Sequence, residues 1–103
     1  MRNPQWQRAH GSMPLTRATD RYTSGVDGIN FLMQDGQMAV ICRIDVETLF
    51  QFGRTIGLSE RTEIFETGRA MIERAANNRY DRTSRRPYEV LIVTADDLGL
   101  DKA

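Results

Sequence analysis

Several residue types are scarce in this sequence of 103 amino acids, and each scarcity excludes a class of protein. The chain has one cysteine, which excludes an internal disulfide framework and a zinc site built from several cysteines. Its one histidine, His10, has no nearby partner for a catalytic triad or a histidine zinc site. No apolar run approaches the roughly 18 residues of a membrane span, and residues 1–25 lack the apolar part of a signal peptide. We therefore expect a cytoplasmic protein that makes no membrane contact.

An excess of charge of one sign is also missing. Fourteen Lys and Arg balance fourteen Asp and Glu, so the net charge is zero, and Lys102 is the only lysine. A dedicated non-specific nucleic-acid binder usually carries a strong basic excess, which this chain lacks. With 40% hydrophobic and 27% charged residues, the composition is typical of one ordinary globular domain.

The first 25 residues differ from the rest because they are polar and show no periodicity. We interpret residues 1–25 as a flexible N-terminal arm. Within it, Gly11-Ser12-Met13 resembles a cloning scar, so residues 1–12 are interpreted as a leader or tag. Residues 26–103 then form a single domain.

A β-hairpin is the strongest local signal. Residues 29–33 and 38–44 alternate apolar side chains, and Asp35-Gly36 between them favours a two-residue type I′ turn. That turn predicts the pairs Met33–Met38, Phe31–Val40 and Ile29–Cys42, all on one face. The opposite face would carry a mixed set that includes Leu32 and Ile41.

Two helices follow the hairpin. Asp45 is a natural N-cap for the first, and Gly57 suits the position after its C-terminus. Ser59 is the expected N-cap of the second helix, which we end near Arg79. Its expected apolar stripe is Ile64, Phe65, Gly68, Met71, Ile72 and Ala75, and its expected solvent side is Glu63, Glu66, Arg69, Glu73 and Asn77.

The last expected strand, residues 88–94, has four consecutive apolar residues, a pattern typical of a strand that is interior to a sheet or covered on both faces. The elements follow the order β-β-α-α-β. This order predicts an α+β fold: a small antiparallel sheet in two layers, with both helices on one face. Such a sheet leaves apolar surface on its second face, which the arm or a second subunit would cover.

One set of residues keeps a characteristic order and spacing along roughly residues 20–97: Asp35-Gly36, Val40, Cys42, Ile44, Glu47, Leu49, Phe65, Arg69, Ile72, Glu73, Ala75 or Ala76, Tyr80, and Asp96 or Asp97. In this order and spacing the chain resembles the bacterial domain of unknown function 1488. The resemblance implies a small α+β domain and no assigned activity.

An arginine cluster is the candidate binding feature. Arg79, Arg82, Arg85 and Arg86, with Tyr80 beside them, could hold phosphate groups and stack bases, and Arg74 adds a further charge. The alternative interpretation is structural, since cations are favoured near the C-terminus of the second helix.

Other candidates for chemistry have simpler explanations. Cys42 is expected in the core as a packing residue rather than a nucleophile. Asp96, Asp97 and Asp101 match no metal-binding spacing and are expected to cap a terminal turn. We therefore assign no catalytic, cofactor or metal residue.

Three functions stay open. The first is a small non-enzymatic interaction or regulatory module, a homodimer or the binder of an unidentified protein partner. The alternative is nucleic-acid or phosphate-ligand binding through the arginine cluster at residues 74–86. An enzyme ranks last, because no nucleophile, base or metal can be named.

Overall fold

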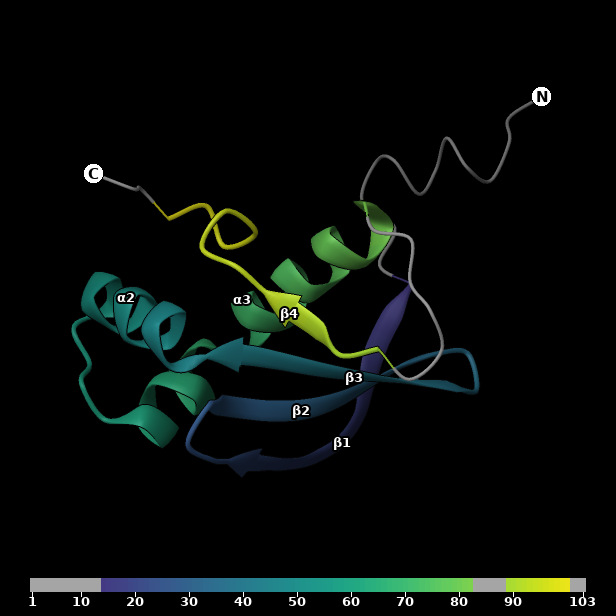
Figure 1. Ribbon diagram of the computed structural model, residues 1–103, viewed down its shortest axis with the longest axis horizontal. Coiled ribbons are helices and arrows are strands. Elements are labelled where there is room, and N and C mark those ends of the chain that lie inside the picture. The colour runs from purple at the N-terminus through teal and green to yellow at the C-terminus, as the bar shows by residue number, and fades with distance from the viewer. Residues whose placement is uncertain (1–13, 83–88, 101–103) are drawn as a thin grey trace.

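The computed structural model describes residues 14–82 and 89–100, which form four strands and two helices in the order β-β-β-α-α-β. The elements are β1 (Leu15–Ser24), β2 (Gly28–Asp35), β3 (Met38–Asp45), α2 (Val46–Ile56), α3 (Arg61–Arg82) and β4 (Leu91–Val93). The strands make one sheet in the order β1-β2-β3-β4. In Figure 1, α3 passes behind β4, and α2 lies beside the end of β3. The α+β class is confirmed, with three strands before the helices rather than two.

The additional strand, β1, comes from the segment that we expected to be a flexible arm. Residues 15–24 pair antiparallel with β2 and form an edge of the sheet. Leu15 is the only residue of β1 that is fully buried, so the strand carries no apolar alternation that could reveal it. Residues 1–13, including His10 and the interpreted leader, lie outside the described residues.

The hairpin forms as predicted, but its turn lies one residue later. Asp35 pairs with Met38, so the two-residue turn is Gly36-Gln37, with Gly36 at φ +62°. Each pairing therefore moves by two residues, which keeps the same side chains on the same face. The buried set is Ile29, Phe31, Met33, Val40, Cys42 and Ile44, while Met38, at the hairpin end, is exposed.

Strand β4 is parallel to β3, and the sheet is mixed rather than antiparallel. Its three residues are fewer than the expected 88–94, and it is an edge strand rather than the interior strand that its apolar run predicted, with Ile92 only partly buried. The connection from β3 to β4 contains both helices, and a crossover of this length is what a parallel neighbour requires.

The first helix ends as predicted, whereas the second begins differently. Gly57 follows α2 in the left-handed region at φ +74°. Asp45 is at the N-cap position, but its carboxylate pairs with Arg43 and makes no cap bond. At α3, the Glu60 carboxylate accepts the backbone N–H of Glu63, a capping contact that we had assigned to Ser59.

Neither helix of the described ranges has the length and apolar character of a membrane-spanning segment.

The core lies between the inner face of the sheet and the two helices. Phe52 of α2 lies against Gly68 of α3 so closely that a Cβ on Gly68 would be 2.2 Å from the ring. Arg69 and Asn77, which we expected in solvent, are buried, and Met71, which we expected in the core, is 52% exposed. The buried apolar residues of the helices and β4 are Leu49, Phe52, Ile64, Phe65, Ile72, Ala75, Ala76, Leu91 and Val93.

Candidate functional site

A bulge in β1 is the most irregular feature of the sheet. Arg17 pairs with Met33 and Tyr22 pairs with Phe31, so the four residues 18–21 oppose a single residue of β2, Leu32. Bulges of this kind bend an edge strand and redirect its side chains.

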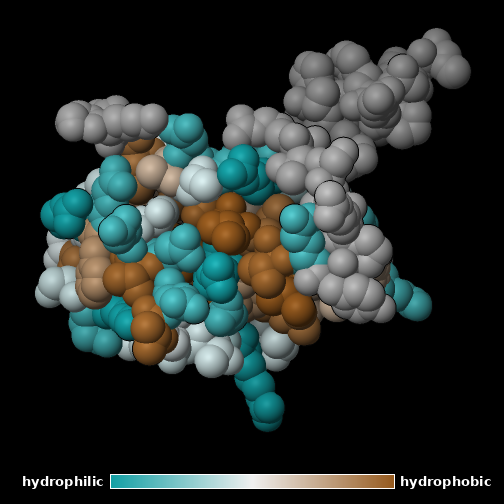
Figure 2. Space-filling model, in the orientation of Figure 1, coloured by the Kyte–Doolittle hydropathy of each residue, from teal (hydrophilic) through white to brown (hydrophobic). Residues whose placement is uncertain are grey.

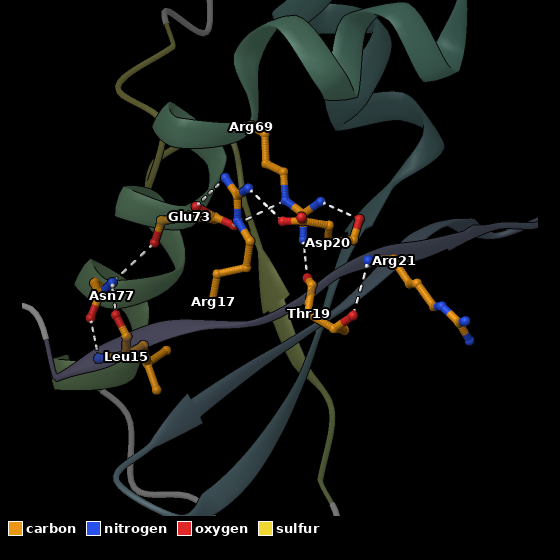
Figure 3. Close-up of polar contacts among 8 residues, drawn as sticks. All are labelled: Leu15, Arg17, Thr19, Asp20, Arg21, Arg69, Glu73 and Asn77. Atoms are coloured by element: carbon orange, nitrogen blue, oxygen red, sulfur yellow. Dashed lines mark hydrogen bonds and ion pairs between the residues drawn. The ribbon is translucent and has the colours of Figure 1, made fainter.

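Arg69 of α3 holds this bulge in place. Its guanidinium donates to the backbone carbonyls of Thr19, at 2.9 Å, and Asp20, at 2.8 Å. Its carbon Cζ lies 5.2 Å from the centre of the Phe65 ring, within cation–π range. Figure 3 shows the Arg69 side chain reaching from α3 to the bulged backbone.

Glu73, one turn further along α3, joins two arginines. It accepts from Arg69 Nε at 3.0 Å and from Arg17 Nε at 2.7 Å, and its side chain is 12% exposed. The hydrogen bond to Glu73, followed by one to Asp20, raises the pKa of Arg17 above its usual value. The carboxylate therefore compensates the charge of the buried Arg69 and ties Arg17 of β1 to α3.

Two further contacts fasten the ends of β1. The Asn77 amide accepts from the Leu15 N–H at 2.8 Å and donates to the Leu15 carbonyl at 3.1 Å, as a neighbouring strand would. At the other end, the Tyr22 hydroxyl donates to Glu66. We call Arg17, Arg69, Glu73 and Asn77 the β1 clamp. The role of the β1 clamp is structural. The only sequence signal for it is the four-residue spacing of Arg69, Glu73 and Asn77, which places them on one side of α3.

The clamp leaves one arginine of the bulge free among the described residues. Arg21 is exposed, has no side-chain partner in that part of the chain, and points away from the clamp in Figure 3. It borders a shallow groove of about 230 Å³ on the sheet. The groove is lined by Thr19, Arg21, Tyr22, Thr23, Asn30, Phe31, Leu32 and Ile41.

The face of the sheet turned away from the helices carries an apolar row. Leu32 of β2 lies opposite Ile41 of β3, and Ile41 is 44% exposed. In β4, the half-buried Ile92 is on the same face, since its neighbours Leu91 and Val93 are buried in the core. Figure 2 shows brown, hydrophobic surface over the strands. We call Thr23, Asn30, Leu32, Ile41, Arg43 and Ile92 the outer face.

The charge on the outer face is largely compensated. Arg43 donates to Asp45 at 3.0 Å on the same strand. Arg21 lies at the β1 edge of this face. In the part of the chain that the structure describes, the outer face therefore has an apolar centre, the Arg43–Asp45 ion pair beside it, and Arg21 as one free cation at its rim.

A second hollow, of about 360 Å³, lies between α3 and the segment after β4. Its lining residues include Met71, Arg74 and Leu98. Thr94 and Asp97 form a capping box at the turn that follows β4. The Asp97 carboxylate accepts the Thr94 backbone N–H at 2.8 Å, and the Asp97 backbone N–H donates to Thr94 Oγ1 at 3.4 Å.

Asp97 therefore caps the terminal turn, as predicted, while Asp101 lies outside the described residues. Within the described part of the chain, no three His, Cys, Asp or Glu residues are grouped in a way that could hold a metal ion.

Two members of the predicted arginine cluster make internal contacts. Arg79 Nε lies 3.5 Å from the buried Asp97 carboxylate and donates to the Ile92 carbonyl at 3.4 Å. The Tyr80 hydroxyl donates to Asp35 at 2.7 Å. These contacts give both residues a structural role. The side chain of Arg82, together with Arg85 and Arg86, lies outside the described residues, so convergence of the cluster stays a prediction.

Cys42 is buried, as predicted for a packing residue. Its side chain is 0% exposed, and its thiol donates to the Val40 carbonyl at 3.7 Å. Burial in apolar surroundings disfavours the thiolate that a nucleophile needs.

The fold and the clamped bulge define a class: a small α+β domain with a four-stranded mixed sheet and two helices on one face. A family model described as "Protein of unknown function (DUF1488)" matches residues 19–92, and the chain belongs to this family. The resemblance seen in the sequence is thereby confirmed.

One solved structure supports the same fold. It is a crystal structure, at 1.60 Å resolution, of a protein of unknown function from the DUF1488 family of Shewanella loihica PV-4. The chain is 20% identical to it, with a TM-score of 0.61, over 80% of this chain and 93% of the other. No curated protein matches the sequence.

Proposed function

We propose that the protein is a small non-enzymatic interaction module that binds another protein through the outer face. The observation that carries this proposal is the apolar row of Leu32, Ile41 and Ile92 on the face of the sheet that α2 and α3 leave open. Exposed apolar surface that is contiguous and rimmed by polar side chains is typical of protein interaction sites.

The energetics of this face favour a protein partner. Burying a whole isoleucine side chain contributes about 1.5–3 kcal/mol, so covering the 44% of Ile41 that is exposed contributes roughly 1 kcal/mol. Arg43 is already paired with Asp45, so a partner does not bury an unpaired charge at the centre. Arg21, at the rim, is free to meet a polar or acidic group.

The proposal places this module in the cytoplasm of a bacterium. A single buried cysteine, Cys42, is in keeping with such a reducing compartment, where structural disulfides are rare.

Site-specific photo-crosslinking in living bacteria tests the proposal. A photo-reactive phenylalanine analogue replaces Ile41 in one strain and Arg54, an exposed residue of α2, in the control strain. The proposal predicts a discrete protein adduct at position 41, formed with a second copy or with another protein, and none at position 54. Equal adducts at both positions, or no adduct at position 41, would overturn it.

A further inference from the structure

We propose that the protein bound at the outer face is a second copy of this chain, so that the module is a homodimer built by packing two sheets face to face. This inference rests on the proposed function. Its starting observation is that both described helices cover the same face of the sheet, and that no helix or strand of residues 14–82 and 89–100 covers the other face.

The size of the outer face suits a second copy. Strands β2 and β3 have eight residues each, or about 26 Å at roughly 3.3 Å per residue. Four strands about 4.8 Å apart give a width of roughly 19 Å. Since β1 has ten residues and β4 only three, the flat footprint is about 450 Å² per copy, and two copies together give about 900 Å², close to the roughly 1,000 Å² expected of a specific interface.

The charge distribution favours a neutral partner. The centre of the face is apolar, and Arg43 is compensated by Asp45 of its own strand. Among the described residues, a strongly acidic protein would find only Arg21 free on this face, whereas a second copy presents the same apolar centre and the same internally paired charge. None of the six outer-face residues is aromatic, so these six side chains offer no platform for stacked bases.

A two-fold axis running along the strands, between the two sheets, satisfies these observations. It places β1 of one copy over β4 of the other and brings the two Ile41 side chains toward the middle of the interface. The sheets would pack about 10 Å apart, with the helices on the two outer sides. Arg21, on the edge strand, would remain at the rim in contact with solvent.

The molecular mass of the full chain in solution tests this inference. Light scattering after size exclusion, over a dilution series, should give twice the chain mass of 11.8 kDa at high concentration. Ile41→Lys should give the mass of a single chain. Met71→Lys is the matched control, since Met71 is 52% exposed on α3 and lies away from the outer face, and it should remain a dimer.

A gentler variant keeps the test informative if Ile41→Lys does not fold. Ile41→Thr retains a β-branched side chain and should raise the dimer dissociation constant about tenfold or more, with an unchanged circular dichroism spectrum.

A wild-type chain that stays monomeric would overturn the homodimer. If position 41 still crosslinks to another protein, the proposed function survives that result. A dimer unaffected by Ile41→Lys would also contradict the inference, because dimerisation would then use another surface.

Discussion

Replacing Arg69 by methionine should destabilise the protein far more than replacing any exposed arginine. The guanidinium of Arg69 makes three hydrogen bonds, to the carbonyls of Thr19 and Asp20 and to the Glu73 carboxylate. Methionine keeps an unbranched apolar stem against the Phe65 ring and removes the charge and all three donors. The variant therefore isolates the polar part of the β1 clamp.

The magnitude follows from burial. Removing one partner of a buried, hydrogen-bonded ion pair costs about 3–5 kcal/mol. Glu73 retains Arg17 as a partner at 2.7 Å, and water can reach the carbonyls of an edge strand, so the expected loss is near the lower limit, about 3 kcal/mol. That is a large share of the roughly 5–15 kcal/mol that stabilises a typical domain.

Urea unfolding followed by circular dichroism measures this loss. With a slope of about 1.5 kcal/mol per molar urea, the midpoint should fall by about 2 M. The control is Arg17→Met, which removes a 39% exposed arginine from the same carboxylate and should cost about 1 kcal/mol or less. Equal losses for the two variants, or a loss below 1 kcal/mol for Arg69→Met, would refute the reasoning that Arg69 is the centre of the clamp.

Three further results are expected. Gly68→Ala should lower the free energy of unfolding by about 1–3 kcal/mol, because the new Cβ would lie 2.2 Å from the Phe52 ring. This loss should outweigh the higher helix propensity of alanine. Urea unfolding measures the loss, and the double variant Gly68→Ala/Phe52→Leu should recover part of the lost stability. The hydrogen bond to Glu66 raises the pKa of Tyr22. This contact therefore stabilises the fold below the ordinary tyrosine pKa of about 10, and the stabilisation is lost as the pH rises through the higher pKa of the folded state. In a carbon-13 NMR titration, Glu66→Gln should lower the pKa of Tyr22, and an unchanged pKa would contradict the assignment. Cys42 should react with a thiol reagent in 8 M urea and hardly at all in buffer, and rapid reaction in buffer would contradict its burial.

The sequence predicted the parts of the fold that local patterns determine. Alternation in residues 29–33 and 38–44 placed the correct side chains in the core, and Gly57 ended α2 because a left-handed residue is required there. The hairpin turn was placed one residue too early, since Asp35-Gly36 suits a type I′ turn but Asp35 instead pairs with Met38 and accepts a hydrogen bond from Tyr80.

The elements that tertiary contacts determine were not predicted. Strand β1 has one fully buried side chain, and polar contacts from α3, more than 40 residues away in sequence, hold it to the sheet. For the same reason Arg69 and Asn77 were placed in solvent: their helical positions face β1, which the sequence pattern did not reveal. The outer face, in contrast, was predicted from the side-chain alternation of Leu32 and Ile41.

The most direct test of the central claim is whether the outer face is covered when the intact protein is in solution. In one chain, Ile41 is 44% exposed and Met71 is 52% exposed, so the two methyl groups should broaden to a similar degree when a soluble gadolinium chelate is added to an NMR sample. If the outer face is a binding surface for a second copy, the Ile41 methyl signal should be protected at high protein concentration. On dilution below the dissociation constant, it should become as sensitive as that of Met71. An Ile41 methyl group that broadens as strongly as Met71 at every concentration would contradict the account.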